Sequence, residues 1–369
     1  MIDYNFLLDD MNRTIISISG YGATGSSAVI DYLKEFDCID VLDDFEFQLI
    51  YFPDGISDLE YKLNQSCNRF YDSDVAISRF LSLCEKLDKW YEPAFHGNLL
   101  SIAKEYINDL NPVCWDGYWA YDRLNTPQEE IDSFYQKNEQ IAKANKTRSF
   151  INRIFRKLRI PQLQIHPYAN YSDIFRYRPM YFSVLPDNFL DATRDFLSKL
   201  VALASKKDCD IIAIDMLLPP QNPLKYYRYF NQPVKSIVVS RDPRDLYTRE
   251  VNAKWPVVPH DNVDTFISWY RENMKASINI HDNSILRLCF EDMIYEYENT
   301  TRAIRNFIGV EAGDNGHYFN PHLSVANTQL FSKLPVNQSD ILKIEKELPE
   351  FIYDFSNHIA VQNLSNVIF

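Results

Sequence analysis

Two periodicities alternate in the order of apolar and polar positions along the chain. Short runs that are nearly continuous in apolar and β-branched residues predict strands at residues 14–19, 38–42, 209–215, 234–240 and 284–290. Segments whose apolar residues recur every three or four positions predict helices at residues 26–36, 75–90, 99–110, 189–205, 297–308 and 340–355. Such alternation is typical of an α/β fold, in which helices cover both faces of a mostly parallel sheet.

Residues 57–190 interrupt this alternation with a mostly helical pattern. A chain of 369 residues is long enough for one large α/β domain that carries insertions. We therefore expect a single domain over residues 1–369, in which residues 57–190 form a large helical insertion.

The turn between the first predicted strand and the first predicted helix is rich in glycine and hydroxyl groups. It reads Gly20-Tyr21-Gly22-Ala23-Thr24-Gly25-Ser26-Ser27. Glycine lets the backbone approach an anion, and the free N–H groups at a helix start attract negative charge. The spacing Gly20-x4-Gly25 matches a P-loop, but Ser26 stands where an ATPase has lysine. The pattern predicts a nucleotide-phosphate site that does not perform standard ATP or GTP hydrolysis; the alternative is a loop that only turns the chain.

A second phosphate-binding candidate follows the predicted strand 234–240. Arg241 lies directly at the carboxyl end of this strand, which is where ligands bind in open α/β sheets. A guanidinium group binds phosphate through two parallel hydrogen bonds. Pro243 then begins a helix whose first turn offers more N–H donors. The alternative is an ordinary helix start with surface ion pairs.

The formal net charge of −13 argues against a nucleic-acid partner, because the surface as a whole repels phosphate backbones. Any anion site must therefore be a local basic pocket. Residues 140–172 contain no acidic side chain, and their lysines and arginines lie between residues 143 and 159. This basic segment is a candidate cover for a cofactor, or a contact for an acidic glycan or an anionic membrane surface. A solvated helix face or linker is the alternative.

The six cysteines are scattered, without a C-x-x-C pair or a histidine at ligand spacing. They predict reduced thiols, so we expect neither a metal site nor a disulfide framework. No run reaches the roughly 18 apolar residues of a membrane span, and the N-terminus lacks the basic and apolar regions of a secretory signal. These features favour a cytoplasmic protein.

Three segments together resemble the PAPS-dependent sulfotransferases, which transfer a sulfuryl group from 3′-phosphoadenosine 5′-phosphosulfate (PAPS) to a hydroxyl or amine. Residues 22–27 occupy the place of the family's 5′-phosphosulfate loop, between the first strand and the first helix. Residues 238–245, VVSRDPRD, match the family's 3′-phosphate element. Residues 286–293, LRLCFEDM, resemble its R-Y/F-E-D-L strand end. The resemblance implies a P-loop-kinase-like three-layer sandwich with PAPS as cofactor and without a metal.

The resemblance also implies roles for individual residues. Backbone N–H groups and hydroxyls of the loop would hold the 5′-phosphosulfate, from Gly22, Ala23, Thr24, Gly25, Ser26 and Ser27. Arg241 would hold the 3′-phosphate. Many members have a serine eight residues after that arginine, whereas this chain has Arg249, preceded by Thr248, and either fits the role.

Two other positions depart from the family pattern. The basic residue of the phosphosulfate loop is replaced by Ala23, so another group must neutralise the donor, and the basic 143–159 segment is our candidate. The glycine-rich C-terminal cofactor loop of the cytosolic branch is absent. Residues 320–329 hold the comparable place, and their polar side chains are candidates to contact the nucleotide or the acceptor.

Sulfuryl transfer to a hydroxyl requires a general base. Some family members use a histidine and others a glutamate shortly after the first helix; Glu46, flanked by two phenylalanines, occupies that second place. Flanking aromatic rings exclude water and so raise the pKa of a carboxyl. Asp43, Asp44 and His96 are competing candidates. A loop whose acids are only solvated is the alternative.

The sequence thus predicts a PAPS-dependent sulfotransferase that acts on a carbohydrate or another hydroxyl-bearing acceptor. Residues 57–190 are expected to shape the acceptor site. A P-loop phosphotransferase is the second hypothesis, which the missing lysine and the RDPRD element disfavour. A catalytically degenerate nucleotide-binding protein is the third, because residues 23 and 249 depart from the family pattern.

Overall fold

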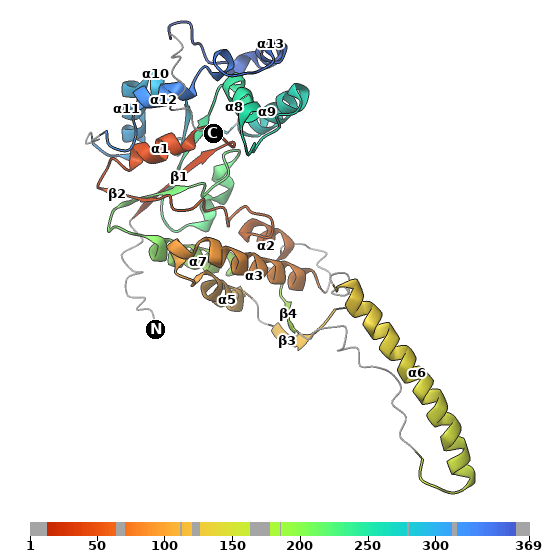
Figure 1. Cartoon of the computed structure of the whole chain (residues 1–369). Coiled ribbons are helices and arrows are strands. Elements are labelled where there is room, and N and C mark those ends of the chain that lie inside the picture. The colour runs from red at the N-terminus through yellow and green to blue at the C-terminus, as the bar shows by residue number, and fades with distance from the viewer. Residues whose placement is uncertain are drawn as a thin grey trace. The chain divides into compact units, whose positions relative to one another are not determined.

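The computed structural model describes residues 13–63, 71–110, 113–119, 126–162, 178–184, 186–278, 280–311 and 316–358. The chain divides into two compact units, each assembled from separate stretches (Figure 1). Unit 1 comprises Met1–Tyr61, Arg79–Ile107 and Asp187–Phe369, and unit 2 comprises Lys62–Ser78 and Asn108–Pro186. The expected helical insertion at 57–190 is therefore split between the units, because residues 79–107 belong to unit 1.

A five-stranded sheet forms the centre of unit 1, with the strand order β2-β5-β1-β6-β7. The strands are β1 (Thr14–Gly20), β2 (Ile39–Leu42), β5 (Ile211–Asp215), β6 (Val234–Ser240) and β7 (Ile285–Cys289). All neighbouring pairs are parallel, so the carboxyl ends of the strands meet at one edge. β1 is the middle strand, which places the loop that follows it at the centre of this edge.

Helices cover both faces of the sheet. On one face, α1 (Ser26–Leu33) and α11 (Tyr297–Ile308) pack against Ile237 and Val239. On the other, α8 (Pro243–Asn252), α9 (Val263–Ile278) and α13 (Gln338–Glu347) pack around Val238. Successive residues of β6 thus serve opposite cores, as the two-residue period of a strand requires. The predicted α/β class, with a parallel sheet in a three-layer sandwich, is confirmed.

Three helices have residues in both units, and most of the remaining elements of unit 1 are short. α2 (Ile56–Leu63), α3 (Asp72–Trp90) and α5 (Leu99–Leu110) each have residues in both units. In unit 1, Phe80 of α3 and Tyr106 of α5 pack with Phe196 of α7 (Phe189–Ala204). The short helices are α4 (Glu92–Phe95), η5 (Pro223–Tyr229), α10 (Asp292–Tyr295), α12 (Pro321–Ser324), η6 (Val325–Asn327), η7 (Leu330–Ser332) and η8 (Pro349–Phe351).

Unit 2 contains a two-stranded antiparallel sheet and the longest helix that the structure describes. The strands are β3 (Val113–Gly117) and β4 (Arg178–Phe182), and the helix is α6 (Gln128–Lys157). Arg178 donates two hydrogen bonds to the buried Asp74 carboxylate, at 3.0 and 2.6 Å. The sequence pattern missed both strands, because neither is long enough to show a clear two-residue alternation.

Several predicted elements match the structure to within a few residues, and one is wrong at its end. The predicted strand at 234–240 and the helices at 99–110 and 297–308 are correct at both ends. The predicted helix at 340–355 ends at Glu347, because Pro349 cannot continue the α-helical hydrogen bonding. No helix among the described residues is both long and apolar enough to cross a bilayer.

Two glycines with nearly the same backbone conformation offer a matched test of the packing at the start of α1. Gly25 has φ +86° and Gly309, at the end of α11, has φ +88°. A Cβ atom on Gly25 would lie 2.4 Å from Cδ2 of Phe290, whereas one on Gly309 would meet nothing within 4 Å.

We expect Gly309→Ala to lower the free energy of unfolding by about 1–2 kcal/mol, the cost of a left-handed residue with a side chain. Gly25→Ala should cost about 1–3 kcal/mol more, because the ring must move. Chemical denaturation of both variants measures the difference. Equal losses would show that Phe290 yields without strain.

Candidate functional site

The loop after β1 is closed by the side chain of Thr24. Its hydroxyl oxygen accepts a hydrogen bond from the Tyr21 N–H at 3.0 Å, and the hydroxyl donates to the Val239 carbonyl at 2.8 Å. Thr24 is almost fully buried. The sequence suggested that this hydroxyl contacts a phosphate, but the structure uses it to shape the loop and to fasten it to β6.

The loop leads into α1 with an open first turn. Gly25 precedes the helix in a left-handed conformation and offers no side-chain cap, and the first turn contains no acidic residue. The first N–H groups of a helix have no partner within it, so those of Ser26 and Ser27 remain available to an anion. The Ser26 side chain is half-buried and that of Ser27 is exposed.

Arg241 joins the loop to two other segments at the carboxyl edge of the sheet. Its Nη1 donates to the Ala23 carbonyl at 3.2 Å, and its Nη2 donates to the Asn327 carbonyl. The guanidinium carbon lies 5.0 Å from the centre of the Phe290 ring, the same ring that faces Gly25. The three segments on which the family resemblance depends therefore meet at this point.

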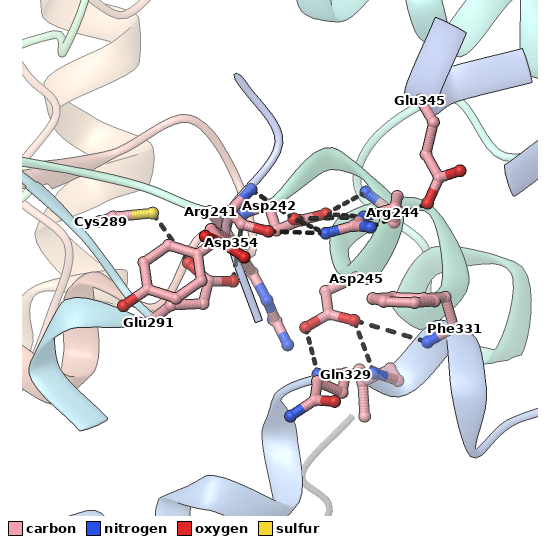
Figure 2. A network of polar contacts seen from close by, with 12 residues as sticks. Arg241, Asp242, Arg244, Asp245, Cys289, Glu291, Gln329, Phe331, Glu345 and Asp354 are labelled. Carbon is pink, nitrogen blue, oxygen red and sulfur yellow. Dashed lines mark hydrogen bonds and ion pairs between the residues drawn. The ribbon is translucent and has the colours of Figure 1, made fainter. Parts of the chain in front are cut away.

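Buried carboxylates hold the surroundings of Arg241 in place (Figure 2). Asp242 caps α8 by accepting from the Arg244 N–H, and it also pairs with the Arg244 guanidinium at 2.7 Å. Asp245 accepts hydrogen bonds from the backbone N–H groups of residues 329, 330 and 331. Glu291 accepts from the Asp242 N–H at 3.1 Å, and burial raises the pKa of Glu291 to about 7. The acids of the RDPRD element thus position the backbone around Arg241.

A cavity of about 470 Å³, which we call the loop cavity, opens beside these groups. Its walls combine the start of α1, two arginines, three phenylalanine or tyrosine side chains and the segment before η6. The residues that line it are Ala23, Gly25, Ser27, Ala28, Asp31, Arg241, Arg249, Phe290, Gly316, His317, Tyr318, Phe319, Asn320, Leu323, Ser324 and Asn327. Its volume lies within the usual range of small-molecule sites.

The structure distinguishes between the two residues proposed for the position after the arginine. Arg249 lines the loop cavity, and its guanidinium contacts the Glu250 carboxylate. Thr248 is fully buried outside the cavity lining, and its hydroxyl has no hydrogen-bond partner among the described residues. Arg249 is therefore the better placed of the two to contact a ligand.

Two other sequence expectations concern the neutralising charge and the C-terminal loop. The described lining contains two arginines, and Arg241 and Arg249 both come from unit 1. The basic 143–159 segment belongs to unit 2, and its contribution stays a prediction. Asn320, Ser324 and Asn327 come from the predicted 320–329 segment and line the loop cavity.

The predicted base candidates after β2 lie in an acidic loop. Glu46 is exposed, and its carboxylate accepts a hydrogen bond from Gln48 at 2.7 Å. Asp43 pairs with Lys34 at 2.5 Å, and Asp44 pairs with Lys206. His96 is exposed at the end of α4, outside the loop-cavity lining. Of the three carboxylates, Glu46 alone has no cationic partner among the described contacts, so it can act as a base without breaking an ion pair.

Sequence reasoning missed Asp215, at the carboxyl end of β5. Asp215 pairs with Ile18 of β1, and its Oδ1 atom is buried without a hydrogen-bond partner among the described residues. Burial, with the charges of Glu46 and Asp43 nearby, raises the pKa of Asp215 to about 7. A carboxyl with such a pKa at a ligand-binding edge is a candidate general base. Its position as the last residue of the predicted 209–215 strand was the available signal.

No group of histidine, cysteine or acidic residues in the described part of the chain is arranged to hold a metal ion. No family model matches the chain, and no curated protein matches it in sequence. Among solved structures, the sulfotransferase domain of the Synechococcus PCC 7002 olefin synthase aligns with 93% of this chain and 94% of that chain. The identity is 13% and the TM-score 0.38.

The raised pKa of Asp215 makes a prediction for stability against pH. The folded-state pKa of about 7 lies above the ordinary value of 3.8, so folding disfavours the charged form. The contribution of Asp215 to the free energy of unfolding is fully present below about pH 4, where the carboxyl is protonated in both states, and is lost as the pH rises through 7. Asp215→Asn removes this loss, so its melting temperature should rise relative to the parent between pH 4.5 and pH 8. A constant difference across that range would exclude the raised pKa.

Proposed function

We propose that this protein is a PAPS-dependent sulfotransferase that transfers a sulfuryl group to a hydroxyl or amine of an acceptor. The observation that carries the proposal is the loop cavity, where the open first turn of α1 meets Arg241 and Arg249. Helix N-termini and guanidinium groups are the two protein features that bind phosphate most readily. The N–H groups at the start of α1 and the guanidinium groups form two sets of donors, which match a nucleoside that carries phosphates at both its 5′ and 3′ positions.

The residues present fit PAPS. The backbone N–H groups of Ser26 and Ser27, with their hydroxyls, would hold the 5′-phosphosulfate. Arg249, with Arg241 behind it, would hold the 3′-phosphate. No lysine lines the loop cavity among the described residues, which favours this ligand over the ATP of a P-loop phosphotransferase.

Sulfuryl transfer requires the protein to stabilise developing negative charge and to provide a proton acceptor. Bound PAPS supplies a sulfuryl group whose S–O bond to the 5′-phosphate breaks as the acceptor oxygen bonds to sulfur, and the electron pair leaves with the phosphate. The N–H groups at the start of α1 stabilise the negative charge that develops on this phosphate. The acceptor proton passes to a carboxylate of the chain.

We assign the base to the carboxylate pair formed by Asp215 and Glu46, whose charges interact. Asp215 has the more suitable pKa, about 7, because it is buried and faces a second negative charge. Glu46 is more accessible. Asp215 and Glu46, like Asp44 and His96, lie outside the loop-cavity lining. Asp44 is a weaker candidate because it pairs with Lys206, and His96 remains an alternative base.

We further propose a carbohydrate acceptor, and an acidic glycan is one candidate because residues 143–159 are basic. A cytoplasmic location is part of the same proposal, supported by the scattered cysteines of the sequence. A degenerate protein that binds the nucleotide without transfer is the competing function. It is favoured by Ala23, whose carbonyl occupies one nitrogen of Arg241.

Nucleotide selectivity tests the cofactor. Calorimetry should show that adenosine 3′,5′-bisphosphate binds more tightly than AMP, and more tightly than ATP with Mg²⁺. Arg249→Met should weaken the bisphosphate by about 1.5–3 kcal/mol, the worth of a hydrogen bond to a charged group, and should leave AMP unchanged. Arg241→Ala should weaken bisphosphate binding by at least as much, because it also removes the hydrogen bond that holds the loop at the Ala23 carbonyl.

Arg302→Met, on the exposed side of α11, is the matched control and should bind like the parent. A parent that prefers ATP, or that binds AMP and the bisphosphate equally, would refute PAPS as the cofactor.

Turnover tests the base. With radiolabelled PAPS and a panel of glycans and small hydroxyl compounds, Asp215→Asn should lower the transfer rate about 10²–10⁴-fold and leave bisphosphate affinity intact. The parental rate should rise with pH through about 7, because the base must be deprotonated. If only Glu46→Gln lowered the transfer rate to this extent, Glu46 would be the general base instead of Asp215. Bisphosphate binding without transfer to any acceptor would support the degenerate protein.

A further inference from the structure

Unit 1 contains a second cavity, of about 430 Å³, which we call the α9 cavity. It lies among β6, β7, α9 and residues 350–353 near the C-terminus. Its lining residues are Tyr21, Val238, Ser240, Arg241, Tyr270, Met274, Ser277, His281, Arg287, Cys289, Glu350, Phe351, Ile352 and Tyr353. Arg241 is the one residue that it shares with the lining of the loop cavity.

The polar group that distinguishes the α9 cavity is the guanidinium of Arg287. This side chain comes from β7, and the residue is half-buried. Its Nη1 donates to the Tyr21 hydroxyl at 3.3 Å, whereas its Nη2 is buried and has no hydrogen-bond partner among the described residues. A buried charged nitrogen without a partner is costly, and a carboxylate bound to the Arg287 guanidinium would offset this cost.

The hydroxyl beside Arg287 is held in a fixed orientation. Tyr21 donates to the Ser277 hydroxyl at 2.9 Å, and Ser277 in turn donates to the Met274 carbonyl. Because the Tyr21 hydroxyl donates its proton to Ser277, a lone pair of its oxygen remains to accept the hydrogen bond from Arg287. The guanidinium is therefore anchored at one nitrogen, and its buried Nη2 has no hydrogen-bond partner among the described residues.

The charges around the α9 cavity limit the ligand to a single negative charge. Arg287 has no ion-pair partner among the described residues, while Arg241 is surrounded by Asp242, Asp245 and Glu291. His281 and Glu350 are exposed lining residues, and the Glu350 carboxylate would repel a dianion. Inorganic phosphate at neutral pH is therefore a poor match.

The rest of the wall is apolar and aromatic, with Val238, Met274, Phe351 and Ile352 among its members. Such a wall favours a hydrocarbon or aromatic body, and the volume far exceeds that of a small ion. We propose that the α9 cavity binds an organic monoanion, with its carboxylate on Arg287 and its apolar body against α9 and residues 351–352. This site is separate from the nucleotide site of the proposed function.

Thermal unfolding with defined probes tests the site. Phenylacetate and hexanoate should raise the melting temperature of the parent in a saturable manner, because a ligand that binds the native state stabilises it. Acetate lacks the body, and benzyl alcohol lacks the charge; each should need at least a tenfold higher concentration for the same shift. No saturable shift with either carboxylate probe would overturn the proposal.

Variants separate binding from structure. Arg287→Met should abolish the phenylacetate shift, whereas Arg271→Met, which removes a surface arginine of α9, should retain it. Without ligand, Arg287→Met should melt at the same temperature as the parent or above it, since it removes an unpaired buried charge. A marked drop would show that Arg287 is structural, and an undiminished phenylacetate shift would place the anion elsewhere; either result overturns the proposal.

Tyr21→Phe keeps the charge and removes the anchoring hydroxyl, so it should weaken phenylacetate about 3- to 10-fold, the loss of one hydrogen bond. Unchanged phenylacetate affinity would contradict the anchoring role. Binding of adenosine 3′,5′-bisphosphate to Arg287→Met should equal that of the parent. This second titration keeps a failure of the α9 cavity distinguishable from a failure of the PAPS proposal.

Discussion

The contact between the Arg241 guanidinium and the carbonyl of Ala23 determines the geometry of the candidate site. In the parallel sheet, Gly20 lies opposite Val239, so the segments that follow β1 and β6 leave the sheet at the same edge. Thr24 reinforces the contact through its own bond to Val239. Because these groups are buried, moving the loop would leave polar atoms without partners, at about 1–3 kcal/mol for each one. The start of α1 therefore stays fixed where an anion can use it.

Holding that geometry requires negative charge in the interior. Asp242, Asp245 and Glu291 are each fully buried, which is unfavourable for carboxylates unless they receive hydrogen bonds. Asp245 receives three from residues 329–331, and Asp242 receives two backbone N–H bonds, from residues 244 and 353. The same acids partly balance the buried Arg241. The stability of this region and the backbone geometry around Arg241 thus depend on one network, shown in Figure 2.

Much of the fold followed from the sequence, because the buried strands and amphipathic helices carry strong periodicities. The 234–240 strand and the 297–308 helix needed no tertiary information. The structural role of Thr24 could not be predicted, because only the pairing of β1 with β6 brings its hydroxyl against the Val239 carbonyl. Asp215 was missed because its pKa depends on burial in the folded chain and on the charges of Glu46 and Asp43, which the pairing of β2 with β5 brings close. In each case the deciding neighbour is distant in the sequence.

Arg241 grips main-chain oxygen atoms at both of its terminal nitrogens, those of Ala23 and Asn327. Such a grip makes no demand on the side chains at positions 23 and 327, which are free to change while the carbonyl groups stay in place. The side chains at these positions can then change, so that a sequence motif is no longer recognisable, while the backbone keeps the same conformation. This gives a physical reason why a chain can keep the backbone geometry of this loop although its sequence matches no family model.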